Sequence, residues 1–457
     1  MRDNRRVSDD EGSLPRKAFA RSARLAALPL GYAGRSAMGL GKRLGGAPAE
    51  AVLAEVQQRT AEQLFRTLGE LKGGAMKVGQ QMSILESALP EDWVAPYRAQ
   101  LTALQDSAPP MPTMTVRRLL GEALGPGWDQ RLISFDPVHA AAASIGQVHR
   151  GVWREPDGSE RDVAIKVQYP GSAEALRADL RQLSRLARTL GPLVPGLDAR
   201  ALVEELQART VEELDYDLEA QAQRAFAASY RDDPEIVVPD VVAVGPGVLV
   251  TEWMESHGSL ARIIREGSQV ERDEYGLLYA RFLFGCPART GMLHADPHPG
   301  NFRLLPDDGG PRRLGVLDFG AVARLPGGEV PRGLGRLVAI AASGDYDALV
   351  EHLRTEGFIR ERIKVDPDQL RSYLGPFIEP ASQETFRFTR AWMRQQFRRL
   401  NNPRSDDYAT MLRLNLPPAY LLIHRTWTGA IGVLSQLEAE LPFRALLESD
   451  LPGFAED

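Results

Sequence analysis

The chain has 457 residues, and its 55 lysines and arginines against 61 aspartates and glutamates give a formal net charge of −6. This mildly acidic balance excludes a nucleic-acid-binding protein that relies on overall positive charge. An apolar content of 43% suffices for a packed core and excludes a globally disordered chain. Cys286 is the only cysteine, which excludes internal disulfides and cysteine-rich zinc sites, so a reducing, cytoplasmic location is expected. No uncharged stretch approaches the roughly 20 residues of a membrane-spanning helix, and none is predicted.

Residues 1–48 are predicted to be a disordered or loosely helical basic arm. Every charged side chain between residues 16 and 43 is basic, and apolar side chains lie among them. Such a segment can pack on the body of the protein, or it can lie on anionic lipid headgroups and gain both burial and Coulomb attraction. Both interpretations stay open, and the second predicts a peripheral membrane contact through residues 16–43.

After the arm, the chain alternates between helical and strand patterns. Residues 49–104 and 115–124 are predicted to be helical, with a proline-rich linker at 109–112 between them. Strands are expected at 148–153, 162–169, 236–244 and 248–253, the first two as a hairpin. A long helical region is expected over 171–230. From residue 259 the pattern is mostly helical, except for a loop-rich region around 292–322.

This order predicts an α+β, bilobal, protein-kinase-like fold with a small β-rich N-lobe and a larger helical C-lobe. A helical N-terminal extension is expected to pack on the cleft. The predicted domains are the basic arm (1–48), the helical extension (49–127), an N-lobe with inserted helices (128–258) and a C-lobe with the catalytic loop (259–457).

Two motifs in the loop-rich region indicate phosphoryl transfer. Asp296 and Asn301 lie in H-A-D-P-H-P-G-N with the spacing of the Asp and Asn in a kinase catalytic loop. Asp318 begins D-F-G after a predicted strand. Phosphoryl transfer needs a carboxylate near the attacking oxygen and oxygen ligands for magnesium. We therefore predict that Asp296 is catalytic and that Asn301 and Asp318 bind Mg²⁺.

The two histidines beside Asp296 allow a different interpretation, a zinc or iron site at His294 and His298. Prolines at 297 and 299 prevent the helical i, i+4 arrangement of such ligands, and no third nitrogen or sulfur ligand is near in sequence. A role in shaping the loop is therefore favoured.

A lysine on a predicted strand and a glutamate on a predicted helix complete the kinase pattern. Lys166 ends V-A-I-K, the motif whose lysine pairs with nucleotide phosphates and with a helical glutamate. Asp215 and Glu219 are four residues apart and are expected to share a helix face. Either could be only a solvated charge, but the kinase context favours Glu219 as the partner of Lys166.

The segment before this strand departs from ordinary kinases, which cover the phosphates with a glycine-rich loop. Here the corresponding segment, 139–149, reads H-A-A-A-A-S-I-G-Q-V-H. Alanine restricts the backbone and adds methyl groups, so the nucleotide contact should differ in geometry. The predicted nucleotide-binding residues of this loop are Ala141, Ala142, Ala143, Ser144, Ile145 and Gly146.

Together these motifs, with Lys-x-Gly-Gln at 77–80 and the E-x-D segment at 213–215, resemble the UbiB family of atypical, protein-kinase-like proteins (aarF-domain kinases). The resemblance implies that Lys77 and Gln80 reach into the active site and that Glu213 and Asp215 face the extension. It also implies that Glu252, Trp253 and Met254 line an adenine-binding hinge. The roles predicted above for Lys166, Glu219 and Asp296 are implied as well.

The resemblance implies an ATP- or ADP-binding, magnesium-dependent phosphotransferase or ATPase that acts in or regulates isoprenoid-quinone or other lipid metabolism, with a lipid or isoprenoid ligand. Two alternatives stay open. One is a protein serine/threonine kinase, which the alanine-rich loop and the extension disfavour because both alter the substrate cleft. The other is a nucleotide-binding pseudokinase scaffold, although the catalytic residue set is complete.

Overall fold

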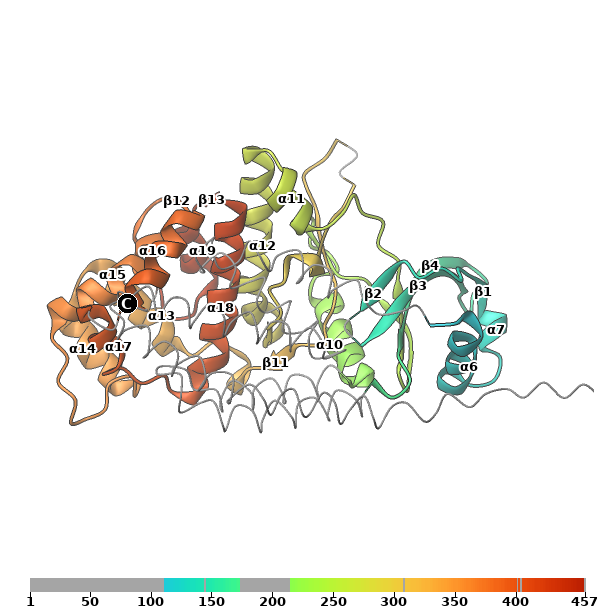
Figure 1. The fold of residues 1–457 in the computed structure, drawn as a ribbon, viewed down its shortest axis with the longest axis horizontal. Helices are drawn as coiled ribbons and strands as arrows, with labels where there is room; N and C mark the ends of the chain where they lie inside the picture. The colour runs from blue at the N-terminus through green and yellow to red at the C-terminus, as the bar shows by residue number, and fades with distance from the viewer. Residues whose placement is uncertain are drawn as a thin grey trace, which may run out of the picture. The chain divides into compact units, whose positions relative to one another are not determined.

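The protein is described by a computed structural model that covers residues 111–143, 145–172, 214–306, 309–400, 402 and 405–455 (Figure 1). The predictions made for the basic arm and for residues 49–110 and 173–213 lie outside these described residues. The same is true of four predicted site residues, Lys77, Gln80, Ser144 and Glu213.

One antiparallel, six-stranded sheet dominates the first part of the structure. Its strand order is β1-β3-β4-β7-β6, and β2 pairs with β3. The strands are β1 (Leu132–Phe135), β2 (Ala141–Ala143), β3 (Gly146–Arg154), β4 (Glu160–Gln168), β6 (Val241–Gly245) and β7 (Val248–Glu252). The hairpin predicted at 148–153 and 162–169 is β3–β4. β3 is longer than predicted at both ends, whereas β4 begins two residues earlier and ends one residue earlier than predicted.

The alternation of side chains along β4 explains how a charged lysine is placed beside a core strand. Val163, Ile165 and Val167 are fully buried on one face of the strand. Successive side chains of a strand point to opposite faces, so Lys166 points away from this apolar layer. The V-A-I-K sequence therefore anchors the strand and presents the ammonium group at the same time.

Among the described residues, the helices that accompany the sheet are α6 (Thr113–Leu124), α7 (Trp128–Arg131) and α10 (Tyr216–Ser229). Helices α6 and α10 both contact β6 and β7. The approach of α6 to β6 is close, because a Cβ on Gly245 would lie 2.2 Å from the carbonyl oxygen of Ala123. Residue 245 is therefore restricted to glycine by packing.

The strand predicted over 236–244 is wrong as a single element. The structure has β5 (Ile236–Val237) and β6, which belong to different sheets. Pro239 lies between them, and a proline cannot donate a ladder hydrogen bond. Its carbonyl accepts a hydrogen bond from Gln223 of α10 at 2.7 Å instead. β5 runs parallel to β10 (Leu314–Val316), which also pairs with β9 (Phe302–Leu304).

The second part of the structure is mainly helical, with the long α12 and α18 in contact with each other (Figure 1). Ser268 and Glu271 form a capping box that starts α12, and Gly291 ends it at φ +68°. Its helices are α11 (Leu260–Glu266), α12 (Gln269–Thr290), α13 (Arg332–Ser343), α14 (Tyr346–Thr355), α15 (Pro367–Ser382), α16 (Arg390–Leu400), α17 (Asp406–Met411), α18 (Pro418–Leu437) and α19 (Phe443–Asp450).

Short elements complete this part: β8 (Met292–His294), η3 (Pro299–Asn301), β11 (Val322–Arg324), η4 (Pro326–Gly328), β12 (Phe386–Arg387) and β13 (Glu440–Leu441). β8 pairs with β11, and β12 pairs with β13. The last pair lies in a region whose pattern indicated helices alone. None of the helices among the described residues is long and apolar enough to cross a bilayer.

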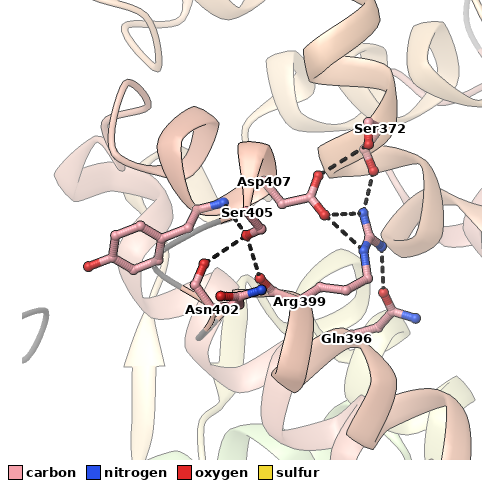
Figure 2. Close-up of polar contacts among 7 residues, drawn as sticks. Ser372, Gln396, Arg399, Asn402, Ser405 and Asp407 are labelled. Carbon is pink, nitrogen blue, oxygen red and sulfur yellow. Dashed lines mark hydrogen bonds and ion pairs between the residues drawn. The ribbon is translucent and has the colours of Figure 1, made fainter. Parts of the chain in front are cut away.

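A polar cluster centred on Arg399 joins α15, α16 and α17 (Figure 2). The Arg399 guanidinium donates to Asp407 at 3.0 Å, to the side chain of Gln396 at 2.8 Å and to the carbonyl oxygen of Ser372. The hydroxyl of Ser372 donates to the other Asp407 oxygen at 3.2 Å. Every one of these hydrogen bonds involves the guanidinium or its carboxylate partner, so the pair links the three helices.

Candidate active site

A buried ion pair joins the β-sheet to helix α10. The Lys166 ammonium donates to both carboxylate oxygens of Glu219, at 2.8 and 3.0 Å. The side chain of Lys166 is 19% exposed and that of Glu219 only 3%. Fifty-three residues separate them in sequence. The structure therefore brings together the two residues predicted to form this pair, and it does so where water is largely excluded.

Asp318 adds a second carboxylate to the same ammonium group, with its Oδ1 3.8 Å from Nζ of Lys166. Burial alone would lower the pKa of Lys166, but the negative charges of Asp318 and Glu219 more than offset it and raise the pKa well above its usual value. The lysine is therefore held as a cation between two carboxylates. A fixed cation of this kind is suited to bind phosphate oxygens.

The segment that carries Asp296 is held by its own backbone and by a buried tyrosine. Asp296 is 7% exposed, and one of its oxygens accepts a hydrogen bond from the backbone N–H of His298 at 3.2 Å. The hydroxyl of Tyr279, on α12, donates to the carbonyl of Pro297 at 2.7 Å. Sequence reasoning missed Tyr279, because a tyrosine within a helix carries no local signal for such a contact.

The D-F-G segment adopts an unusual backbone conformation. Asp318 has φ +65°, in the left-handed region that aspartate tolerates better than most residues. Its Oδ1 accepts a hydrogen bond from the N–H of Gly320 at 3.2 Å. Just before it, the N–H of Leu317 donates to the carbonyl of Asn301 at 2.8 Å. This bond ties the segment that contains Asp296 and Asn301 directly to the D-F-G segment.

His294 connects the same two segments. Its Nε2 lies 2.9 Å from the carbonyl oxygen of Asp318, and because a carbonyl only accepts, Nε2 carries the proton. The ring is fully buried, and burial lowers the pKa of His294, so the imidazole is neutral. Its Nε2 is thus committed to the loop, which agrees with a shaping role.

An aromatic cluster links α10 to both motifs. Phe226 lies on α10 about two helical turns beyond Glu219, and its ring centroid is 5.1 Å from that of Phe319 in D-F-G. Phe226 also lies 6.2 Å from His294, whose ring meets Phe319 edge-on at 5.3 Å. Because these rings are buried together, the helix that carries Glu219 and the segment that carries Asp318 pack as one unit.

The residues present fit a magnesium ion. Within the described ranges no group of three or more His, Cys, Asp or Glu side chains suits a metal, so a protein-only cage is not offered there. Asp318 offers a carboxylate that is 41% exposed, and Asn301 offers the oxygen of its side-chain amide. A few hard oxygen ligands, completed by water and substrate phosphates, are what Mg²⁺ prefers.

The alanine-rich segment is a tight β-hairpin. Ala141, Ala142 and Ala143 form β2 and pair with Val148, Gln147 and Gly146 of β3. A Cβ on Gly146 would lie 2.2 Å from the carbonyl oxygen of Val167, so this position must be glycine. The single glycine is thus required by the close approach of β3 to β4, next to Lys166.

Behind this hairpin, a chain of three hydrogen bonds fixes its base. The Nδ1 of His149 lies 2.8 Å from the carbonyl of Asp136, so Nδ1 donates and Nε2 accepts from the amide of Gln147 at 2.6 Å. The Gln147 oxygen then accepts from the N–H of Met111 at 2.7 Å. His149 is fully buried, and burial lowers its pKa, which keeps the ring neutral as this chain requires.

The predicted hinge lies at the end of β7. The backbone N–H groups of Glu252 and Trp253 already donate to the carbonyls of Asp240 and Asp162, both at 2.9 Å. Met254 packs tightly against β10, where a Cβ on Gly315 would lie 2.0 Å from its sulfur. These two bonds use the N–H groups of two of the three predicted hinge residues. The N–H group of the third, Met254, takes part in neither bond.

Asp215 does not share a helix face with Glu219, which corrects that expectation. It is the N-cap of α10, and its carboxylate accepts hydrogen bonds from the N–H groups of Asp217 and Leu218 at 3.0 and 3.1 Å. Its predicted contact with the K-x-G-Q extension involves residues outside the described ranges.

Comparison with known proteins identifies the family. A family model described as the ABC1 atypical kinase-like domain matches residues 103–353. The chain belongs to this family. It is 32% identical to the mitochondrial atypical kinase coq-8 of Caenorhabditis elegans, over 77% of this chain and 46% of that protein. It is 28% identical to the chloroplastic Activity of bc1 complex kinase 3 of Arabidopsis thaliana, over 98% of this chain and 59% of that protein.

These matches confirm the UbiB resemblance, and they also confirm the kinase-like fold class. A solved structure from Mycobacterium tuberculosis, described as a complex with erythromycin, is 43% identical, with a TM-score of 0.66. The match covers 90% of this chain and all of that one. The chain spans about half the length of the curated ABC1-family relatives it matches.

Proposed function

We propose that this ABC1-family protein is an ATP-binding, magnesium-dependent phosphotransferase or ATPase. The observation that carries the proposal is the buried pair of Lys166 and Glu219, with the Asp318 carboxylate 3.8 Å from the same ammonium. A desolvated cation beside a carboxylate from D-F-G is the arrangement that phosphoryl transfer needs. A structural ion pair would not require the third charged group.

In this proposal each residue has a defined task. Lys166 binds the nucleotide phosphates and is kept in place by Glu219. Asp318 and Asn301 hold the magnesium ion, which neutralises charge on the phosphate oxygens when it is bound. Asp296 accepts a proton from the attacking hydroxyl or orients a water molecule. Met254 contributes the hinge N–H to the base of the nucleotide, because those of Glu252 and Trp253 are already used.

The test is magnesium-dependent ATP turnover by the full chain. Asp318→Asn removes the charged metal ligand, and Lys166→Arg replaces a compact ammonium with a larger planar group, so each should lower turnover about tenfold or more. Asp232→Asn and Lys364→Arg make the same chemical changes at exposed positions and should retain turnover. Unchanged turnover in both site variants would refute the assignment.

The molecule that accepts the phosphoryl group distinguishes the three candidate functions of this site. The UbiB resemblance supports a phosphotransferase or ATPase in isoprenoid-quinone or other lipid metabolism. ATP turnover by such an enzyme should change when lipids or isoprenoids are added, and a strain that carries Asp318→Asn should accumulate a lipid intermediate. Robust transfer of labelled phosphate to a peptide array would favour a protein serine/threonine kinase. Tight nucleotide binding without turnover under any lipid condition would favour a pseudokinase scaffold.

Binding of a macrolide-like ligand is a second candidate function, and one observation favours it. The solved structure of the Mycobacterium tuberculosis relative, all of which is covered by the match to this chain, is described as a complex with erythromycin. Titration calorimetry with erythromycin, with and without ATP and magnesium, tests this candidate. Heat of binding at micromolar concentration would support it, and its absence would remove it.

Membrane contact through residues 16–43 is proposed separately, from the one-sided basic charge of that segment. Sedimentation with anionic liposomes should fall when Arg16, Lys17, Arg21 and Arg24 are replaced by alanine. Equal sedimentation with neutral liposomes would remove the electrostatic argument.

A further inference from the structure

The ammonium group of Lys166 faces an aromatic ring in addition to its two carboxylates. The ring centroid of Tyr216 lies 5.1 Å from Nζ of Lys166. This is within the distance at which a cation is attracted by the negative face of an aromatic ring. Tyr216 is only 2% exposed, so water does not compete for the contact.

The start of α10 is built to place this ring. Asp215 caps the helix, Tyr216 is its first residue, and Glu219 follows three positions later on the same side. The side-chain amide of Gln168 donates to the carbonyl of Leu214 at 2.9 Å. Gln168 is two residues beyond Lys166 on β4, so the strand that carries the lysine also holds the residue before the helix cap.

We propose that Tyr216 is a positioning residue that fixes the ammonium of Lys166 for phosphate binding, through the face of its ring. The assignment rests on the proposed nucleotide-binding function. Glu219 holds the ammonium from one direction through two hydrogen bonds, and the ring limits its movement from another. When phosphate oxygens bind the ammonium of Lys166, the ring can stay beside it, because a neutral ring does not repel the phosphate as a carboxylate would.

The alternative is that Tyr216 only fills space in the core. The two possibilities differ in what they require of the ring. A space-filling role depends on shape alone, whereas attraction between a cation and a ring depends on the electrostatic potential of the ring face. Fluorine on a phenylalanine ring weakens that potential with little change of shape. A fluorinated series therefore separates the two roles without the cavity that Tyr216→Leu would create.

The experiment incorporates phenylalanine and its mono-, di- and trifluoro analogues at position 216 of the full chain. The magnesium-dependent dissociation constant for a non-hydrolysable ATP analogue is measured, together with the melting temperature without nucleotide. Affinity should weaken progressively with fluorination, reaching about five- to tenfold for the trifluoro analogue. Tyr216→Phe itself should stay within about twofold of the parent, because it keeps the ring.

The same series in a Lys166→Met background is the decisive comparison. If the ring acts through the ammonium, the melting temperature should fall with fluorination when Lys166 is present and should stay constant when it is not. Tyr346, at the start of α14, provides a matched control, because its ring centroid lies 4.7 Å from the guanidinium of Arg371 in α15 and it is also buried. Fluorination at 346 should leave nucleotide affinity unchanged.

Three results would overturn the proposal. The first is a nucleotide affinity and a melting temperature that do not change with fluorination. The second is a melting temperature that falls equally with and without Lys166, and the third is a loss of affinity in Tyr216→Phe as large as that in the trifluoro analogue. The last would assign the effect to the hydroxyl group. The melting-temperature series needs no nucleotide. It therefore still decides the role of Tyr216 if the protein binds no ATP, in which case the proposed function would fail by itself.

Discussion

Replacing Glu219 with glutamine tests whether the Lys166–Glu219 pair holds the sheet against α10. The substitution keeps the shape of the side chain and one acceptor oxygen but removes the negative charge. Removing one partner of a fully buried ion pair costs about 3–5 kcal/mol. Here Lys166 is 19% exposed and Asp318 remains 3.8 Å away, so part of this cost is recovered. We expect a loss of about 1–3 kcal/mol in the free energy of unfolding.

The assay is thermal unfolding at pH 7.5 without nucleotide, followed by nucleotide titration. A loss of this size lowers the melting temperature by roughly 1–3 °C in a chain of 457 residues, because the entropy of unfolding grows with chain length. Affinity for an ATP analogue should fall about tenfold, because the ammonium is no longer held by two hydrogen bonds.

An exposed ion pair with a similar distance is the matched control. Arg118 and Glu122 on α6 are 2.7 Å apart, and their side chains are 56% and 58% exposed. Glu122→Gln should therefore change stability by no more than about 0.5 kcal/mol. If Glu219→Gln and Glu122→Gln behave alike in both measurements, burial of the Lys166 pair has no energetic consequence and the reasoning is refuted.

Three further predictions concern the hairpin and the C-terminal helices. Gly146→Ala should weaken nucleotide binding and lower the melting temperature, since its Cβ would lie 2.2 Å from a β4 carbonyl; an unchanged affinity would contradict this. Burial lowers the pKa of His149, so as the pH falls this histidine takes up a proton in the unfolded chain before it does so in the folded protein. The free energy of unfolding should therefore decrease as pH falls below about 6.5, by at most about 1.4 kcal/mol per pH unit. Urea unfolding at pH 7.5, 6.5 and 5.5 measures this, and the change of stability with pH should be smaller in His149→Gln than in the parent; an equal change in both would contradict the prediction. Asp407→Asn should destabilise the protein by about 1–3 kcal/mol in urea unfolding, because Arg399 loses a charged acceptor in a pair that is 23% and 13% exposed; a smaller effect than Glu122→Gln would contradict the role of that cluster.

The sequence by itself determined the residue types of the site and the elements that carry them. V-A-I-K alternates apolar and outward positions, so it predicts a strand that presents Lys166, and the structure places it on β4. The order of the motifs along the chain predicted the kinase-like fold, because each motif needs a particular element on which to act. These are local properties, and a local pattern is sufficient to reveal them.

Only the tertiary structure decided which residues meet. The contacts of Lys166 with Glu219, of Tyr279 with the loop at Pro297, and of Lys166 with the ring of Tyr216 join distant or unmarked positions. Asp215 had the same local signal as Glu219, yet it caps the helix while Glu219 enters the site. The physical reason is that burial and contact depend on how strands and helices pack over long sequence separations, whereas the spacing of residue types reports only the element in which they lie.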